Sequence, residues 1–178
     1  MATQIVLLRG INLGAKRRVA MPVLRELLTE AGFSDVRTYV QSGNAVLSSS
    51  KAPTRVSNDC ERLISEAFGF AVDVVVRTRD ELAEVVARNP LGDVATEPKR
   101  YQVSFLAAAL DEPVIDKLSE LAHERERFVA IDRELYAWHP DGVARSKLWN
   151  KLASQGLGVI ATARNWTTVT TLLAMADE

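Results

Sequence analysis

The chain has 178 residues, of which 47% are hydrophobic and 25% charged, and its formal net charge is −1. These values are typical of a soluble protein with one ordinary domain or two small ones, and no apolar run approaches the ~20 residues of a membrane-spanning helix. The single cysteine, Cys60, excludes an internal disulfide and a cysteine metal cluster, and no cationic segment precedes a signal-type core, so we expect a cytoplasmic protein. We also expect no metal site and no cofactor.

The first half of the chain predicts strands and helices in the order βαββαβ. The strands are expected at residues 4–8, 36–40, 45–48 and 72–76, and the helices from Pro22 to Gly32 and over 56–68. The helical segments carry apolar residues at helical spacing, and the first strand contains a continuous apolar run from Ile5 to Leu8. A Ser-Gly step within Gln41–Asn44 is typical of a tight turn, which makes the flanking strands a hairpin. Thr78 and Glu81 form a capping box that predicts a further helix over 79–88.

After a linker at residues 91–98, the same order of elements returns. The strands are expected at residues 101–106, 128–131, 135–138 and 159–161, and the helices near 114–121, 148–156 and 166–176. Asp111 and Asn165 occupy N-cap positions, where a side-chain oxygen accepts from the first backbone amides of a helix. The two halves share the order of their elements but few identical residues.

This repeated order is typical of the ferredoxin-like sandwich, in which helices cover one face of a sheet. We therefore predict an α+β fold of two ferredoxin-like (βαββαβ) α/β sandwich units, residues 1–90 and 99–178, each followed by an extra helix. In such a unit the first two strands run parallel, so their carboxyl ends lie at one edge of the sheet. The connection Arg9–Arg18, hereafter the basic loop, and the Gln41–Asn44 turn should therefore be neighbours in space.

The basic loop is the strongest candidate for a binding site. Residues 1–25 hold five basic residues and no acid, whereas the rest of the chain holds 17 basic and 23 acidic residues. The connection from Gly10 to Ala20 has 11 residues, although such connections usually take ~2–6. Gly10 and Gly14 permit a positive φ and let backbone amides approach an anion. The loop also leads into a helix N-terminus, which favours phosphate or carboxylate.

The predicted ligand-binding residues come from the basic loop and the facing turn. They are Arg9, Gly10, Asn12, Gly14, Lys16, Arg17, Gln41, Ser42, Gly43 and Asn44. Arg9 directly follows a strand and its planar fork suits two oxygens of an anion, whereas Lys16 to Arg18 are expected to steer a ligand. In the alternative interpretation, Asn12 and Asn44 satisfy loop backbone and the basic run is a solvated face.

Other motifs give weaker signals. The basic loop lacks both the Gly-Lys-Ser/Thr ending of a P-loop and the three-glycine dinucleotide fingerprint. No strand carries the RNA-binding signature, so nucleic acid is not an expected partner. Ser42 lacks the Gly-x-Ser-x-Gly frame of an exposed nucleophile. His123 is interpreted as a solvated residue, and neither it nor His139 has a second ligand at metal spacing.

Five stretches along the chain form a recognisable set. They are Leu-Arg-Gly-Ile-Asn at 8–12, Met-Pro at 21–22, Arg-Thr-Tyr-Val-Gln-Ser-Gly-Asn at 37–44, Asp-Gly-Val-Ala-Arg-Ser-Lys-Leu at 141–148 and Thr-Ala-Arg-Asn-Trp-Thr-Thr-Val at 162–169. In this order they closely resemble the DUF1697 family of small, mostly bacterial proteins. The resemblance implies two ferredoxin-like halves and a set of signature residues, and it implies no reaction. Members of the family often have Gly-Gly at the position where this chain has Gly14-Ala15.

Three classes of function stay open at this point. The first is a binding module for a small anionic molecule, such as a phosphorylated metabolite or a nucleotide, at the basic loop and the Gln41–Asn44 turn. The second is an enzyme at the same edge whose reaction the residues do not assign. The third is a protein-interaction module that uses this edge without a small ligand. The oligomeric state is open as well.

Overall fold

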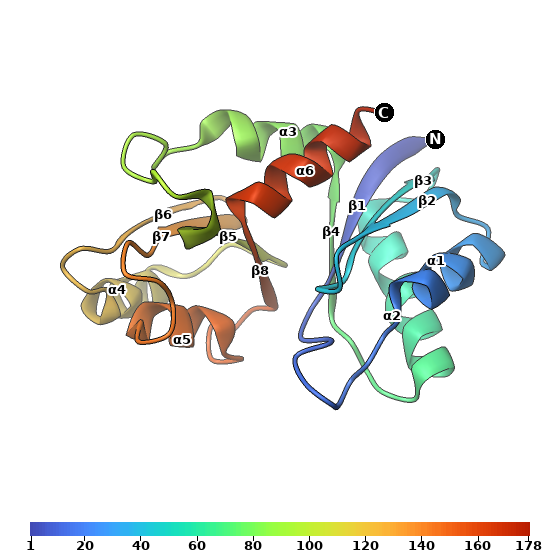
Figure 1. Ribbon diagram of the computed structural model, residues 1–178, viewed down its shortest axis with the longest axis horizontal. Coiled ribbons are helices and arrows are strands. Elements are labelled where there is room, and N and C mark those ends of the chain that lie inside the picture. Colours follow the sequence, from blue (N-terminus) through green and yellow to red (C-terminus); the bar gives the residue numbers. More distant parts are fainter. The chain divides into compact units, whose positions relative to one another are not determined.

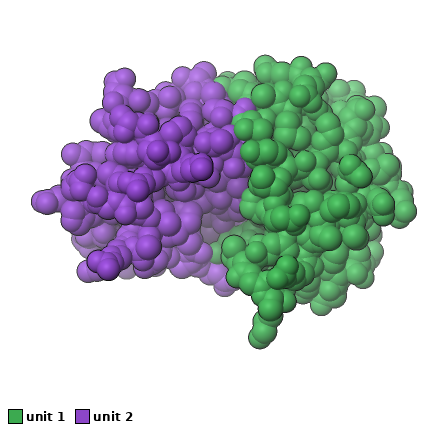
Figure 2. All heavy atoms as spheres, viewed as in Figure 1, with its two compact units in different colours: residues 1–84, 171–178 green, residues 85–170 purple.

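The computed structural model describes all 178 residues. They form two compact units, which Figure 2 distinguishes by colour. Unit 1 consists of residues 1–84 and 171–178, and unit 2 consists of residues 85–170. Each unit contains one four-stranded sheet.

Unit 1 is built from four strands and the two helices that connect them. The strands are β1 (Ala2–Leu8), β2 (Ser34–Tyr39), β3 (Asn44–Ser49) and β4 (Val74–Thr78), and the helices are α1 (Met21–Glu30) and α2 (Pro53–Phe68). The strands lie in the order β2-β3-β1-β4, and every neighbouring pair is antiparallel. Figure 1 shows α1 and α2 together on one face of this sheet. The predicted ferredoxin-like arrangement is thereby confirmed for this unit.

The core of unit 1 lies between its sheet and these two helices. It includes Val6, Leu8, Leu24, Leu28, Ala45, Leu47, Val56, Cys60, Ile64 and Val76. α2 ends where Gly69 adopts φ +78°, a left-handed conformation that glycine tolerates without strain. α2 is also the longest connecting helix, with 16 residues. No helix of the chain has both the length and the apolar character that crossing a membrane requires.

Unit 2 repeats the plan. Its strands are β5 (Tyr101–Leu106), β6 (Arg127–Ile131), β7 (Glu134–Trp138) and β8 (Ala161–Asn165), and its connecting helices are α4 (Glu112–Leu121) and α5 (Lys147–Ala153). A single turn of 3-10 helix, η1 (Pro98–Arg100), precedes β5. The strand order is β6-β7-β5-β8, again antiparallel throughout. Leu118, Leu148 and Leu152 bury the apolar sides of α4 and α5 in the core of this unit.

Two further helices, α3 (Arg79–Arg88) and α6 (Trp166–Ala176), follow the two sheets at the predicted positions. The predicted capping box is present at the start of α3, because the Thr78 amide donates to Glu81 Oε2 at 2.8 Å and the Glu81 amide donates to Thr78 Oγ1 at 3.1 Å. Asn165 Oδ1 accepts from the Thr168 amide at 2.9 Å and so caps α6. The boundary between the units falls inside α3 and inside α6, whereas the linker predicted from the sequence lies at residues 91–98.

The last strand differs from its prediction. The sequence pattern predicts this strand at residues 159–161, whereas β8 covers Ala161–Asn165. Thr162 and Arg164 interrupt the apolar pattern by which a buried strand is predicted, although both residues are buried. Arg164 is accommodated because its guanidinium donates to Thr162 Oγ1 and to the Ala163 carbonyl. Burial nevertheless lowers the pKa of Arg164 to about 10.

Candidate functional site

The basic loop and the Gln41–Asn44 turn meet at one edge of the first sheet. β1 and β2 are both antiparallel to β3, so they run parallel to each other and end on the same side. The Leu8 amide donates to the Gly43 carbonyl at 2.9 Å. The Asn12 side chain reaches the Gln41 carbonyl at 2.7 Å. The predicted proximity of the two segments is therefore confirmed.

Asn12 holds the loop closed through its amide side chain. Its Nδ2 donates to the carbonyls of Val19 and Gln41, and its Oδ1 accepts from the Val19 amide at 2.9 Å. The Asn12 backbone has φ +54°, a conformation that asparagine tolerates better than most residues. Asn44 is similar, since it is fully buried and its Nδ2 donates to the Tyr39 carbonyl and to Ser42 Oγ. Both asparagines satisfy loop atoms, as the alternative interpretation of the sequence proposed.

Arg17 is a second tie within the basic loop. Its Nε donates to the Gly10 carbonyl at 3.0 Å, and its Nη2 donates to the Ala71 carbonyl at 2.9 Å. The guanidinium also lies 5.2 Å from the centre of the Phe70 ring, within the range of a cation–π contact. Arg17 thus connects the two ends of the loop to the segment before β4.

The remaining cations of the loop differ in their surroundings. The Arg9 side chain is 17% exposed and its Nη1 lies 3.6 Å from a carboxylate oxygen of Asp73. Asp73 adds an acid to this edge that is remote in the sequence, which a charge count over residues 1–25 does not reveal. Lys16 and Arg18 are exposed and form no ion pair.

Gly43 allows the turn to pack against the loop. Its φ is +88°, and a Cβ at this position would lie 2.8 Å from both Leu8 Cβ and Ile11 Cδ1. Gly10 also has a positive φ, of +64°, but a Cβ there would meet no atom within 4 Å. Gly14 and the neighbours of Gly43 in the turn, Gln41 and Ser42, are exposed at the same edge.

We expect the Asn12 ties to contribute measurably to stability. Asn12→Gly removes the side-chain hydrogen bonds but tolerates the positive φ, so it should lower the free energy of unfolding by about 1–3 kcal/mol. Asn12→Ala should cost about 1 kcal/mol more, because alanine is also strained at this φ. Urea denaturation of the two variants measures both terms. Equal stability of both variants and the original chain would show that the ties carry no net energy.

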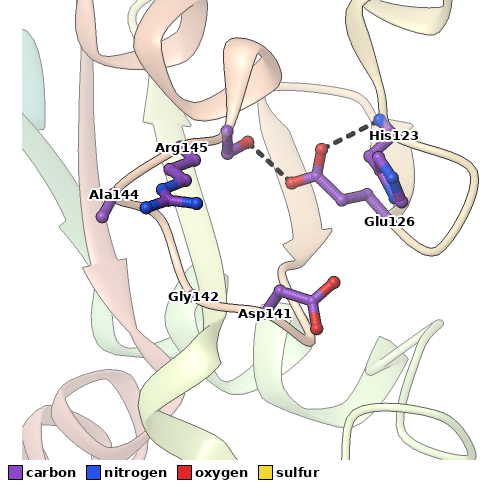
Figure 3. Close-up of a pocket in the computed structure, with 7 residues that line it drawn as sticks. His123, Glu126, Asp141, Gly142, Ala144 and Arg145 are labelled. Carbon is purple, nitrogen blue, oxygen red and sulfur yellow. Dashed lines mark hydrogen bonds between the residues drawn. The ribbon is translucent and has the colours of Figure 1, made fainter.

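Unit 2 contains a buried polar cluster that no motif in the sequence predicts. Glu126 Oε2 accepts from Ser146 Oγ at 2.6 Å and lies in hydrogen-bond contact with His139 Nδ1. Glu126 Oε1 accepts from the His123 amide at 3.0 Å (Figure 3). Ser146 is the N-cap of α5, where its Oγ accepts from the Trp149 amide. The cluster therefore ties the segment before β6, the end of β7 and the start of α5 to one carboxylate.

The geometry of this cluster is not that of a hydrolytic triad. In a triad the acid and the nucleophile bind opposite nitrogens of the imidazole. Here Glu126 and Ser146 both face His139 Nδ1, and the Ser146 hydroxyl is already committed to Glu126 and to the helix cap. His139 Nε2 is buried without a hydrogen-bond partner. The imidazole packs edge-on against the Trp149 ring, with 5.8 Å between the ring centroids.

The structure shows neither a reactive thiol nor a cluster of metal ligands. Burial raises the pKa of the Cys60 thiol to about 12, which makes it a poor nucleophile at neutral pH. The structure brings together no group of three or more His, Cys, Asp and Glu side chains that could hold a metal ion.

The Glu126 cluster was missed because its members lie far apart in the sequence. Glu126, His139 and Ser146 are separated by 13 and 7 residues and belong to different elements, so no local motif contains them. A signal was nevertheless present. Ser146 directly precedes an apolar helical stretch, which is the position of an N-cap, and it lies within the 141–148 stretch that carried the family resemblance.

Comparison with known proteins supports this fold and leaves the activity open. Residues 1–136 match the family model described as a protein of unknown function, DUF1697. The solved structure of a conserved bacterial protein from Streptococcus pneumoniae superposes with a TM-score of 0.79 over 98% of each chain, at 21% sequence identity. At this identity the likeness shows the fold alone. No protein with a curated description matches the chain.

Proposed function

This chain belongs to the DUF1697 family of proteins of unknown function, and we propose that it is a binding module for a small anionic molecule, held by the basic loop and the Gln41–Asn44 turn. The observation that supports the proposal most strongly is the contrast between the ties and the free cations of the loop. Asn12 and Arg17 fix the loop to its surroundings, while Lys16 and Arg18 are exposed on it without an ion pair.

A fixed loop favours binding because little conformational freedom is lost when a ligand arrives. The predicted ligand residues therefore divide into two groups. The first group fixes the conformation of the basic loop and the turn, and it consists of Asn12, Arg17, Gly43 and Asn44. Charge comes from Lys16 and Arg18, and from Arg9, whose guanidinium a bound phosphate or carboxylate would share with Asp73.

Exposed apolar side chains at the same edge support a second candidate, a protein partner. Leu13 is 85% exposed within the basic loop, and Val40 is 49% exposed directly before the turn. Neither side chain would be used by a phosphate group, whereas a protein surface could cover both. The two candidates are distinguished by whether the small anion alone produces the effects described next.

We expect inorganic phosphate or adenosine monophosphate to shift the backbone amide resonances of residues 10–18 in the full chain. The double variant Lys16→Gln with Arg18→Gln should weaken this binding by about tenfold and reduce its salt dependence, because exposed charges act through screened attraction. NMR titration at two salt concentrations measures both quantities.

The matched control is the double variant Lys99→Gln with Lys117→Gln, which removes two exposed positive charges from unit 2. It should bind as the original chain does. The proposal is wrong if neither anion shifts the loop resonances, or if both double variants lose affinity equally, which would mean that only net charge matters.

A further inference from the structure

Unit 2 has a cavity that the Glu126 cluster lines in part, away from the residues proposed to bind a ligand at the basic loop. Its volume is about 460 Å³, within the ~300–1,000 Å³ of small-molecule sites. The lining residues are His123, Glu126, Asp141, Gly142, Ala144, Arg145 and Ser146. Figure 3 shows Arg145 on one side of the cavity and His123 with Glu126 on the other.

The acids of the cavity already have partners within unit 2. The Asp141 carboxylate pairs with Arg125 at 2.6 Å. The Glu126 carboxylate accepts from the Ser146 hydroxyl and the His123 amide and contacts His139, and these hydrogen bonds keep its pKa below the ordinary value although burial raises it. Neither carboxylate is therefore available to pair with Arg145.

Arg145, in contrast, has no partner. It is exposed, forms no ion pair and makes no side-chain hydrogen bond within the chain, although it lines the cavity. Its planar fork can bind two oxygens of one carboxylate or phosphate. The cavity is therefore lined by one cation without a partner in the chain, with a geometry suited to an oxyanion.

Further donors lie on both sides of this charge. His123 Nδ1 accepts from the Arg125 amide at 3.2 Å, so the neutral ring carries its proton on Nε2 and can donate it to a ligand. Residues 143–146 form a turn closed by the hydrogen bond from the Ser146 amide to the Val143 carbonyl. The amides of Ala144 and Arg145 within this turn donate to no acceptor in the chain.

We propose that this cavity binds a small molecule through an oxyanion group, carboxylate or phosphate, held by Arg145 and by His123 Nε2. The buried Glu126 cluster has a positioning role, because it fixes both walls: it holds the His123 backbone on one side and Ser146, next to Arg145, on the other. The site lies entirely in unit 2 and does not depend on the function proposed for the basic loop.

The test is an NMR titration of the full chain with inorganic phosphate and, separately, with succinate. The amides of residues 142–146 should shift with at least one of them, and the effective probe shows whether the site takes phosphate or carboxylate. Arg145→Gln should weaken that binding by about tenfold or more, since hydrogen bonds between charged groups are strong. His123→Ala should weaken it about threefold to tenfold. Because the Arg145 side chain is exposed and makes no hydrogen bond or ion pair within the chain, Arg145→Gln should leave the thermal stability unchanged. His123→Ala should lower it only slightly, since it removes one exposed hydrogen bond from the Arg125 amide.

Lys147→Gln is the matched control, because Lys147 is exposed two residues from Arg145 but does not line the cavity. It should bind as the original chain does, and so should the Lys16→Gln, Arg18→Gln double variant. The proposal is overturned if neither probe shifts residues 142–146, or if Arg145→Gln binds as tightly as Lys147→Gln. Failure at the basic loop with success here, or the reverse, separates the two sites.

Discussion

Glu126→Ala is expected to lower the free energy of unfolding by about 3–5 kcal/mol, the range for removing one member of a buried charged cluster. The substitution leaves the Ser146 hydroxyl, the His123 amide and the buried His139 ring without their acceptor. Urea denaturation followed by circular dichroism measures the change. Glu124→Ala is the control, since Glu124 is exposed two residues away, and it should change stability by less than about 0.5 kcal/mol.

The same carboxylate should make the protein sensitive to acid. Burial raises the pKa of Glu126, but the hydrogen bonds from Ser146, the His123 amide and His139 outweigh burial and hold the pKa below its ordinary value of 4.5. A group whose pKa is lowered on folding stabilises the fold above its unfolded pKa, and this stabilisation is lost as pH falls through the folded pKa. Glu126→Gln should therefore reduce the loss of stability below about pH 4.5. Urea denaturation at several pH values measures this loss for the variant and for the original chain. If the free energy of unfolding falls equally in acid for both, Glu126 does not have this role.

Gly43→Ala is expected to be the most damaging single change at the basic-loop edge. Alanine at a left-handed φ costs about 1–2 kcal/mol, and the overlap of its Cβ with Leu8 and Ile11 should add about 1–3 kcal/mol. Gly10→Ala meets only the first cost, because the space around Gly10 is open. The difference in the free energy of unfolding between the two variants, measured by thermal and urea unfolding, therefore gives the cost of the overlap with Leu8 and Ile11. Equal destabilisation would mean that the turn moves away from the loop at no cost.

The fold could be predicted from the sequence because most of its local signals agree. The spacing of apolar residues predicts the helices. The capping box at Thr78 and Glu81 predicts the start of α3, and the Ser-Gly step predicts the turn between β2 and β3. The one strand that was misplaced, β8, contains Thr162 and Arg164, whose burial depends on side-chain hydrogen bonds within the strand itself. A hydrophobic pattern cannot reveal a strand that buries a satisfied arginine.

The candidate site was predictable in position but not in the role of each residue. Topology alone brought the basic loop and the turn together, since β1 and β2 must end on the same side of the sheet. Which polar side chains face solvent depends on contacts between distant residues. Arg17 lies over Phe70, and Arg9 lies beside Asp73, more than 50 residues away in the sequence in each case. No spacing rule connects such pairs.

The boundary inside α6 has a consequence for folding during synthesis. Residues 171–178 belong to unit 1, although the ribosome makes them after every residue of unit 2. Their contacts there include the ion pairs from Arg79 to Asp177 and from Arg37 to Glu178. The half of the protein that emerges first is therefore the half that is completed last. Unit 1 can therefore gain its full set of contacts only after unit 2 has been synthesised, although domains of a longer chain generally fold as units from the N-terminus.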